Sequence, residues 1–224
     1  MKKFKNCLLS LPRTGSNWVR YWFEYFSSEN TSERNILVET NHWGEQRTEK
    51  TEASVYKRHK LTHKDIEERG IQKLVCVLRD YRECFVRHCR GRTFEKKLSR
   101  MTDYTDNLGV YDAFEGDKMV MYYEDFVSDP ATYMKEFLDF LEVRNEWDDI
   151  DIKEHRNLSV KLYETGGSDK VGSQTRGAPS LTKGKADFKF HQQELPTESK
   201  DLLETWFATE YTHLHDTYLE RYKL

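Results

Sequence analysis

The fold is decided by the stretch Leu8-Leu9-Ser10-Leu11-Pro12-Arg13-Thr14-Gly15-Ser16-Asn17-Trp18-Val19-Arg20. Its apolar beginning predicts a buried strand, and its proline and glycine indicate a sharp turn. The serine and asparagine after the turn can cap the helix that the apolar stripe of residues 18–26 predicts. A strand, a tight loop and a helix N-terminus form an anion site, because backbone N–H groups and the helix dipole favour negative charge. Arg13 adds a planar donor fork, so the stretch predicts a phosphate-like ligand.

The loop lacks the Walker A pattern, in which Gly and four further residues precede Gly-Lys and then Ser or Thr. Residues 12–18, Pro-Arg-Thr-Gly-Ser-Asn-Trp, instead resemble the phosphosulfate-binding loop of the sulfotransferases that use 3′-phosphoadenosine 5′-phosphosulfate (PAPS). The cofactor-binding residues that this resemblance implies are Arg13, Thr14, Gly15, Ser16, Asn17 and Trp18. The indole at the helix start can then stack on a purine. The alternatives are a strand, turn and helix without a ligand, and a core tryptophan.

The composition suits one α/β domain over residues 1–224, and it restricts the partners. The formal net charge is -3, so no global field attracts nucleic acid. The N-terminus has no signal-peptide pattern and no apolar run reaches membrane-spanning length, so we expect no membrane association. The four cysteines form no Cys-x-x-Cys pair, and we interpret them as reduced thiols of a cytoplasmic protein.

Residues 54–59, Ser-Val-Tyr-Lys-Arg-His, predict a strand that ends in a basic cluster. The cluster resembles the Lys-Thr-His with which this strand ends in many cytosolic sulfotransferases, although the Leu-Pro that follows in that family is absent. The resemblance implies that His59 is the general base that deprotonates the acceptor. It also implies that Lys57 and Arg13 stabilise charge on the transferring group. The alternatives are a surface role for His59, and His63 as the base.

The continuous apolar run of residues 73–78 predicts a central parallel strand that leads into a helix. Residues 79–87 resemble a second signature of the family, in which Arg-Asn-Pro-Arg-Asp follows a strand and a Ser stands eight residues after the first Arg. The resemblance implies that Arg79 and Arg87 hold the 3′-phosphate of the cofactor. Asp80-Tyr81 stands where the family has Asn-Pro, and Arg87 replaces the Ser. For Arg79, the alternative is an ordinary salt bridge at a strand end.

Residues 118–122 predict another strand, and residues 131–142, after Asp129-Pro130, predict an amphipathic helix. This segment resembles a third feature of the family, in which a strand is followed by Tyr-Glu-Asp, then Asp-Pro, then a helix. The resemblance implies that Tyr123 approaches the adenine. The acidic residues that follow Tyr123 are expected to cap and brace the helix start rather than to catalyse.

Glycine, serine, threonine and lysine are frequent in residues 165–190, which form either a surface loop or a cover over the cofactor. Within them, residues 182–188 loosely resemble the family's last motif, which is Arg-Lys-Gly, two residues and Gly-Asp-Trp. That resemblance carries over only Lys183 and Gly184 as cofactor ligands. Residues 195–224 predict C-terminal helices.

In their order along the chain, these features predict a three-layer α/β/α fold with a central parallel sheet, the P-loop-NTPase-like fold of sulfotransferases. The nucleotide is expected at the carboxyl ends of the strands. The resemblance implies transfer of a sulfuryl group from PAPS to a hydroxyl or amine of a small-molecule or glycan acceptor, with adenosine 3′,5′-bisphosphate (PAP) as product. It requires no metal and is compatible with a homodimer. The alternatives are a small-molecule kinase with a degenerate phosphate loop and an inactive nucleotide-binding module.

Overall fold

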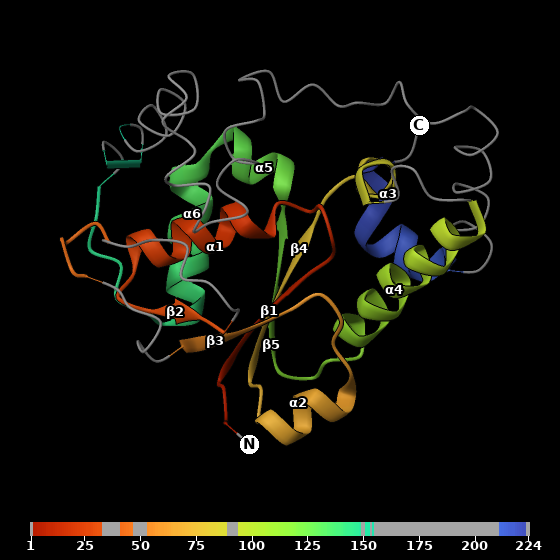
Figure 1. Cartoon of the computed structure of the whole chain (residues 1–224), viewed down its shortest axis with the longest axis horizontal. Coiled ribbons are helices and arrows are strands. Elements are labelled where there is room, and N and C mark those ends of the chain that lie inside the picture. Colours follow the sequence, from red (N-terminus) through yellow and green to blue (C-terminus); the bar gives the residue numbers. More distant parts are fainter. Residues whose placement is uncertain are drawn as a thin grey trace.

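In the part of the chain that the structure describes, five parallel strands form one central sheet (Figure 1). The strands are β1 (Asn6–Ser10), β2 (Asn30–Thr31), β3 (Ala53–Arg58), β4 (Lys73–Leu78) and β5 (Asp117–Tyr122). Their order in the sheet is β2-β3-β1-β4-β5. This computed structural model describes residues 2–32, 41–46, 53–88, 94–148, 151–152, 154 and 211–222.

The strand order brings several carboxyl ends side by side. β1 pairs with β4 up to its last residue, Ser10, and it pairs with β3 up to Arg58. β4 and β5 pair up to their last residues, Leu78 and Tyr122. Open α/β sheets bind ligands in the crevice beyond such strand ends, where the connections on the two sides of one strand diverge. The loops after β1, β3, β4 and β5 are therefore the expected place for a site.

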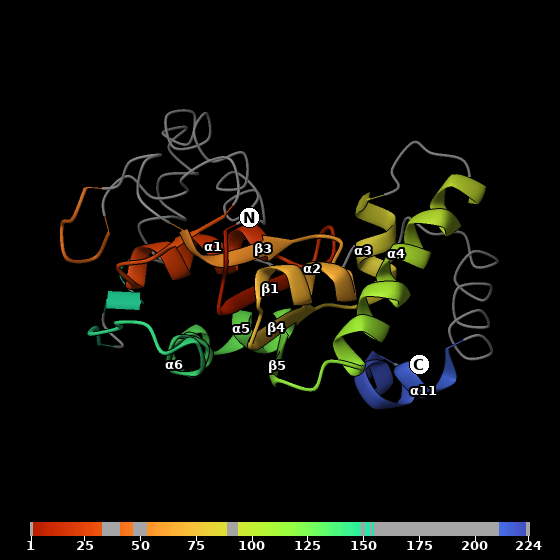
Figure 2. The ribbon, with the colours of Figure 1, turned by 90° about the horizontal axis from the view of Figure 1, so that it is seen from below.

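Helices cover both faces of the sheet and complete three layers. One face carries α1 (Ser16–Phe26), α5 (Tyr123–Ser128) and α6 (Pro130–Leu141), as Figure 1 shows. The other carries α3 (Tyr81–His88), α4 (Phe94–Asp112) and the turns α11 (Thr212–Leu214), η2 (His215–Leu219) and η3 (Glu220–Tyr222) (Figure 2). The short helix α2 (His63–Arg69) joins β3 to β4. This arrangement confirms the predicted α/β/α fold.

Side chains of the inner strands alternate between two hydrophobic cores, as expected for strands covered on both faces. Leu74, Cys76 and Leu78 of β4 pack into the core beside α3 and α4. Val75 and Val77 pack into the core beside α1, α5 and α6. Both cores are rich in aromatic rings, which supply apolar volume to a chain with only 37% hydrophobic residues.

Local signals explain where several helices begin and end. Thr62 and Asp65 form a capping box at the start of α2, and Gly70 ends that helix with φ 70°. Asp129 caps α6, and Pro130 occupies its first position, where no N–H donor is needed. Within the described ranges, none of the helices has both the length and the apolar character needed to cross a membrane.

Two details of the segment from β1 through α1 to β2 differ from the sequence prediction. The cap of α1 is Gly15 rather than a serine or asparagine side chain, because Gly15 adopts a left-handed φ of 89° and turns the chain directly into the helix. β2 was not predicted, since Asn30 and Thr31 are polar and show no strand pattern. They are buried by pairing with β3. Residues 165–190, and the predicted C-terminal helices before residue 211, lie outside the described residues.

Candidate functional site

The loop of residues 11–15 joins β1 to α1 through two left-handed backbone positions. Arg13 has φ 75° and Gly15 has φ 89°. An arginine is uncommon there because its Cβ is crowded, and such positions are concentrated at functional sites. Between them, the hydroxyl and N–H of Thr14 donate to the Leu11 carbonyl at 2.9 and 3.3 Å. No described side chain caps α1, so the helix presents backbone N–H groups and its dipole to an anion at this loop.

The ring of Tyr123 covers this loop at Gly15. Tyr123 follows the last residue of β5 and begins α5. A Cβ atom on Gly15 would lie 2.3 Å from Cδ2 of Tyr123, which is closer than a real side chain allows. Position 15 therefore requires glycine for two reasons: the backbone is left-handed there, and the Tyr123 ring leaves no room for a Cβ atom. The first and third predicted motifs meet in this contact.

Gly15→Ala should lower the free energy of unfolding by about 1–2 kcal/mol more than Gly44→Ala does, because only the first substitution adds overpacking to the backbone strain. Gly44 is the matched control, since its φ is 77° and an added Cβ meets nothing within 4 Å. Urea denaturation measures both values. If the two variants lose the same free energy of unfolding, the Tyr123 ring moves aside without destabilising the fold.

Trp18 lies in an aromatic cluster next to the loop. Its ring centroid is 4.5 Å from that of Phe126, 5.5 Å from Trp22 and 5.8 Å from Tyr123. All these contacts are edge-on, and the side chain is 8% exposed. The structure therefore places the indole in the core beside the candidate site, and stacking on a purine stays a prediction.

Arg79 brings the second motif to the same place. It follows the last residue of β4, and its guanidinium carbon lies 4.2 Å from the ring centroid of Tyr123. The side chain is only 6% exposed, so its charge is weakly screened by water. Tyr123 thus contacts both the Gly15 loop and Arg79. Through Tyr123, the buried guanidinium is brought next to the loop that precedes α1.

Asp80 and Tyr81, the residues that depart from the family pattern, have structural roles here. Asp80 Oδ1 accepts from the backbone N–H of Arg82 at 2.9 Å, which is the bond of a helix N-cap. The Asp80 carboxylate also accepts two bonds from the Arg82 guanidinium, at 3.0 and 2.9 Å. Tyr81 is 1% exposed and packs in the core. The start of α3 is therefore built without the Asn-Pro of the family.

Lys57 and His59 place an ammonium group beside an imidazole at the end of β3. Residues two apart on an extended chain point to the same face, and Lys57 Nζ lies 2.6 Å from His59 Nε2. On the other side of the ring, Nδ1 lies 2.7 Å from the carbonyl oxygen of Ser10. A carbonyl can only accept, so Nδ1 carries the hydrogen and the lone pair of Nε2 accepts from Lys57. His59 and the alternative base, His63, are both exposed, but His63 lies at the start of α2 rather than beside Lys57.

Asn107 holds the backbone that carries His59. Its amide nitrogen donates to the His59 carbonyl at 2.8 Å, and its oxygen accepts from the Leu61 N–H at 2.9 Å. Asn107 is not among the residues predicted from the sequence, although a signal for it is present. Asn107 lies on the same stripe of α4 as the buried Leu108 and Tyr111, and it is 1% exposed. A polar residue on a buried helix face indicates a hydrogen-bond partner.

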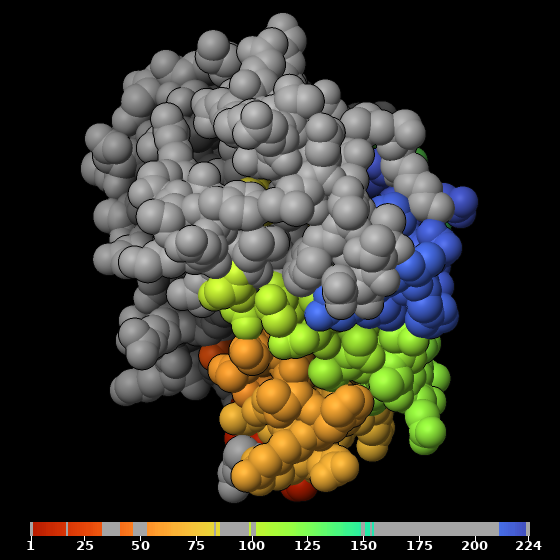
Figure 3. Space-filling view, turned by 90° about the vertical axis from the view of Figure 1, so that its right-hand side faces the viewer, coloured from red at the N-terminus to blue at the C-terminus, as the bar shows by residue number. Residues whose placement is uncertain are grey.

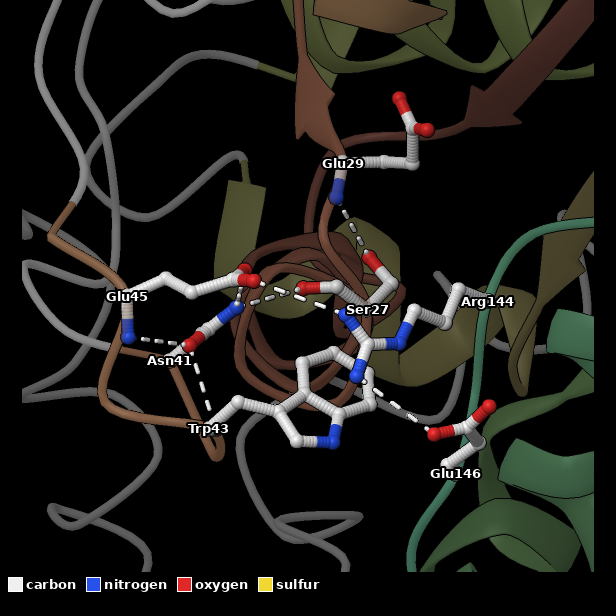
Figure 4. Close-up of polar contacts among 7 residues, drawn as sticks. All are labelled: Ser27, Glu29, Asn41, Trp43, Glu45, Arg144 and Glu146. Atoms are coloured by element: carbon white, nitrogen blue, oxygen red, sulfur yellow. Dashed lines mark hydrogen bonds and ion pairs between the residues drawn. The ribbon is translucent and has the colours of Figure 1, made fainter.

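Asn41, Trp43 and Glu45 form a separate polar cluster with Arg144 (Figure 4). The guanidinium carbon of Arg144 lies 4.2 Å from the ring centroid of Trp43, and Nη1 lies 3.6 Å from a Glu45 carboxylate oxygen. The same segment donates to the Tyr25 carbonyl near the C-terminal end of α1. A helix of 11 residues places that end roughly 15 Å from the loop at its start. The described part of this segment is therefore anchored away from the loop.

Other predicted ligands are placed only in part. Asn17 and Arg87 have described backbones in α1 and α3, but their side chains lie outside the described structure. Lys183 and Gly184 lie outside the described residues altogether. Ser16 is the first residue of α1 and is buried. Among the described side chains, no three His, Cys, Asp or Glu residues are grouped so that they could hold a metal ion.

Comparison with known proteins yields a match in structure rather than in sequence. No protein-family model and no curated protein matches the chain. Among solved structures, the chain is similar to the mouse sulfotransferase SULT7A1 complexed with PAP, with a TM-score of 0.59 and 10% sequence identity over 95% of this chain and 85% of that chain. The similarity shows that the two chains share a fold.

Proposed function

We propose that this protein transfers a sulfuryl group from PAPS to a hydroxyl or amine of a small-molecule or glycan acceptor. The observation that carries the proposal is the meeting of motifs at adjacent strand ends, where the Tyr123 ring contacts both the Gly15 loop and Arg79. The Lys57–His59 pair ends β3, which neighbours β1 in the sheet. A fold shared with a sulfotransferase that was solved with PAP supports the same reaction.

The described groups fit the two anionic ends of PAPS. The N-terminus of α1 and the exposed Arg13 suit the 5′-phosphosulfate, since both offer positive charge next to backbone donors. Arg79 suits the 3′-phosphate, because a guanidinium forms charge-assisted bonds to phosphate. When bound, PAPS supplies an activated sulfuryl group whose bond to the phosphate breaks as the bond to the acceptor forms. The remaining proposed ligands are Thr14, Ser16, Asn17, Trp18, Arg87, Tyr123, Lys183 and Gly184.

His59 takes the proton of the acceptor at Nε2 in this proposal. Nδ1 is bound to the Ser10 carbonyl, so Nε2 is the ring atom with a lone pair. The Lys57 ammonium, which donates to Nε2 in this structure, must turn away as the acceptor hydroxyl approaches. It can then stabilise negative charge on the transferring group, and its 2% exposure strengthens that interaction. Asn107 keeps the imidazole in position through the backbone.

Titration calorimetry with PAP, AMP, and ATP plus Mg²⁺ tests the nucleotide assignment. We expect PAP to bind at least about tenfold more tightly than AMP, because the 3′-phosphate gains charge-assisted bonds to Arg79. Tighter binding of ATP with Mg²⁺ than of PAP would instead favour the small-molecule kinase.

An assay with radiolabelled PAPS and a library of phenols, steroids, sugars, lipids and peptides tests the transfer itself. We expect label to appear in at least one acceptor class, which also identifies the substrate. Binding of PAP without transfer to any member of the library would favour the inactive nucleotide-binding module.

A cytoplasmic location is part of the proposal. Cys7 and Cys76 are buried free thiols in neighbouring strands of one core. Burial raises the pKa of both thiols, which makes them unreactive. Reduced core cysteines suit a reducing compartment. Detection of a disulfide in the native protein by mass spectrometry would contradict this location.

A further inference from the structure

Residues 211–222, in blue in Figure 3, lie against α4, and their last turn is hydrogen-bonded to the start of α5. Arg221 donates two bonds to the Asp125 carboxylate, at 2.7 and 2.6 Å. The hydroxyl of Tyr222 donates to Oε2 of Glu124 at 2.6 Å. Both acidic partners directly follow Tyr123 in the chain. The last turns of the described chain are therefore fastened to the helix that begins at the candidate site.

Glu124, which accepts from Tyr222, also forms a hydrogen bond at the end of β4. Its other oxygen, Oε1, accepts from the backbone N–H of Asp80 at 3.2 Å. That N–H belongs to the peptide group between Arg79 and Asp80, and the carbonyl of the same peptide group accepts from the Tyr104 hydroxyl at 3.3 Å. Tyr104 is itself 2% exposed. The peptide group that carries Arg79 is thus held on both of its polar sides.

Glu124 is therefore linked to both residues that meet over the loop, Tyr123 and Arg79. Tyr123 precedes Glu124, and the Arg79 guanidinium carbon lies 4.2 Å from the centroid of its ring. Burial raises the pKa of Tyr222, and the nearby charge of Glu124 raises it further, so the hydroxyl keeps its proton and remains a donor. Hydrogen bonds to charged groups are among the stronger ones in proteins.

We propose that Glu124 and Tyr222 are positioning residues that set the Arg79 guanidinium and the Tyr123 ring for the 3′-phosphate end of the nucleotide. This inference rests on the proposed function. Tyr222 orients the Glu124 carboxylate, and that carboxylate holds the Arg79 backbone. A site that is ordered before binding loses less conformational entropy when the nucleotide arrives. Selectivity for the 3′-phosphate therefore depends on a hydroxyl supplied from the C-terminal segment.

The test compares Tyr222→Phe with Tyr218→Phe by calorimetry with PAP and AMP. Both variants keep the ring and lose one hydroxyl bound to a carboxylate, since Tyr218 donates to Asp112 Oδ1 at 2.7 Å. Tyr222→Phe should lower PAP affinity about five- to tenfold and leave AMP affinity nearly unchanged, so the PAP-to-AMP ratio falls. Tyr218→Phe should keep the wild-type ratio, and the two melting temperatures should be similar.

If Tyr222→Phe keeps the PAP-to-AMP affinity ratio of the wild type, the inference is overturned. It is also overturned if the ratio falls equally in Tyr222→Phe and Tyr218→Phe. If Tyr222→Phe does not fold, Glu124→Gln decides, because an NH2 donor replaces one of the two carboxylate oxygens and then faces another donor. Its PAP-to-AMP ratio should fall, and an unchanged ratio would again overturn the inference. Equal affinity of the wild type for PAP and AMP would overturn the proposed function itself, and the inference with it.

Discussion

His59→Ala should lower the rate of sulfuryl transfer roughly 100-fold or more, the usual scale for the loss of a general base. Nε2 of His59 faces the Lys57 ammonium at 2.6 Å, and alanine leaves no group there to take the proton of the acceptor. Affinity for PAP should stay nearly unchanged, because the assigned phosphate ligands lie on the β1–α1 loop and at the end of β4. Turnover with the best acceptor and calorimetry with PAP measure the two quantities separately.

His63→Ala is the control for this variant, since His63 is a nearby exposed histidine that starts α2, and its loss should be mild. Near-normal turnover of His59→Ala would discard His59 as the base and would move attention to His63, His42 or Glu39.

Arg79→Ala should remove most of the preference for PAP over AMP, with PAP affinity falling roughly 10- to 100-fold. The guanidinium lies at the end of β4 over the Tyr123 ring, where it is 6% exposed and can bind phosphate with little screening. AMP lacks the 3′-phosphate, so its affinity should change little. Calorimetry with the two nucleotides gives the ratio directly.

Arg69→Ala provides a matched control, because its guanidinium carbon also lies over a tyrosine ring, 3.9 Å from the centroid of Tyr56, but at the C-terminal end of α2. Arg79→Lys keeps the charge and loses the planar fork, so it should restore only part of the preference. An unchanged ratio in Arg79→Ala would transfer the 3′-phosphate role to Arg87 or to another cation.

Much of the fold could be predicted because its signals are local. The apolar run of β4 is buried on both faces, and the prediction of a central parallel strand there is confirmed. The sharp turn before α1 requires a left-handed residue, and glycine is the residue that adopts that conformation without strain. Lys57 and His59 are two apart on an extended strand, so their common face follows from the period of the strand.

The parts of the site that could not be predicted depend on contacts between distant segments. The Tyr123 ring contacts Gly15 from the start of α5, and Asn107 reaches the His59 backbone from α4. β2 is another such case, because its polar residues are in a strand only through pairing with β3. The residue pattern of a single helix or strand does not predict which distant residues will contact it.

The sequence by itself determined the layered α/β architecture, the turn before α1 and the strand-end positions of His59 and Arg79, because periodicity and turn chemistry depend on neighbours in the chain. Only the tertiary structure decided that Tyr123 joins the loop to Arg79 and that Tyr222 holds Glu124. Tyr222 and Glu124 are 98 residues apart, and their contact exists only because the packed sheet brings the end of the chain to the start of α5.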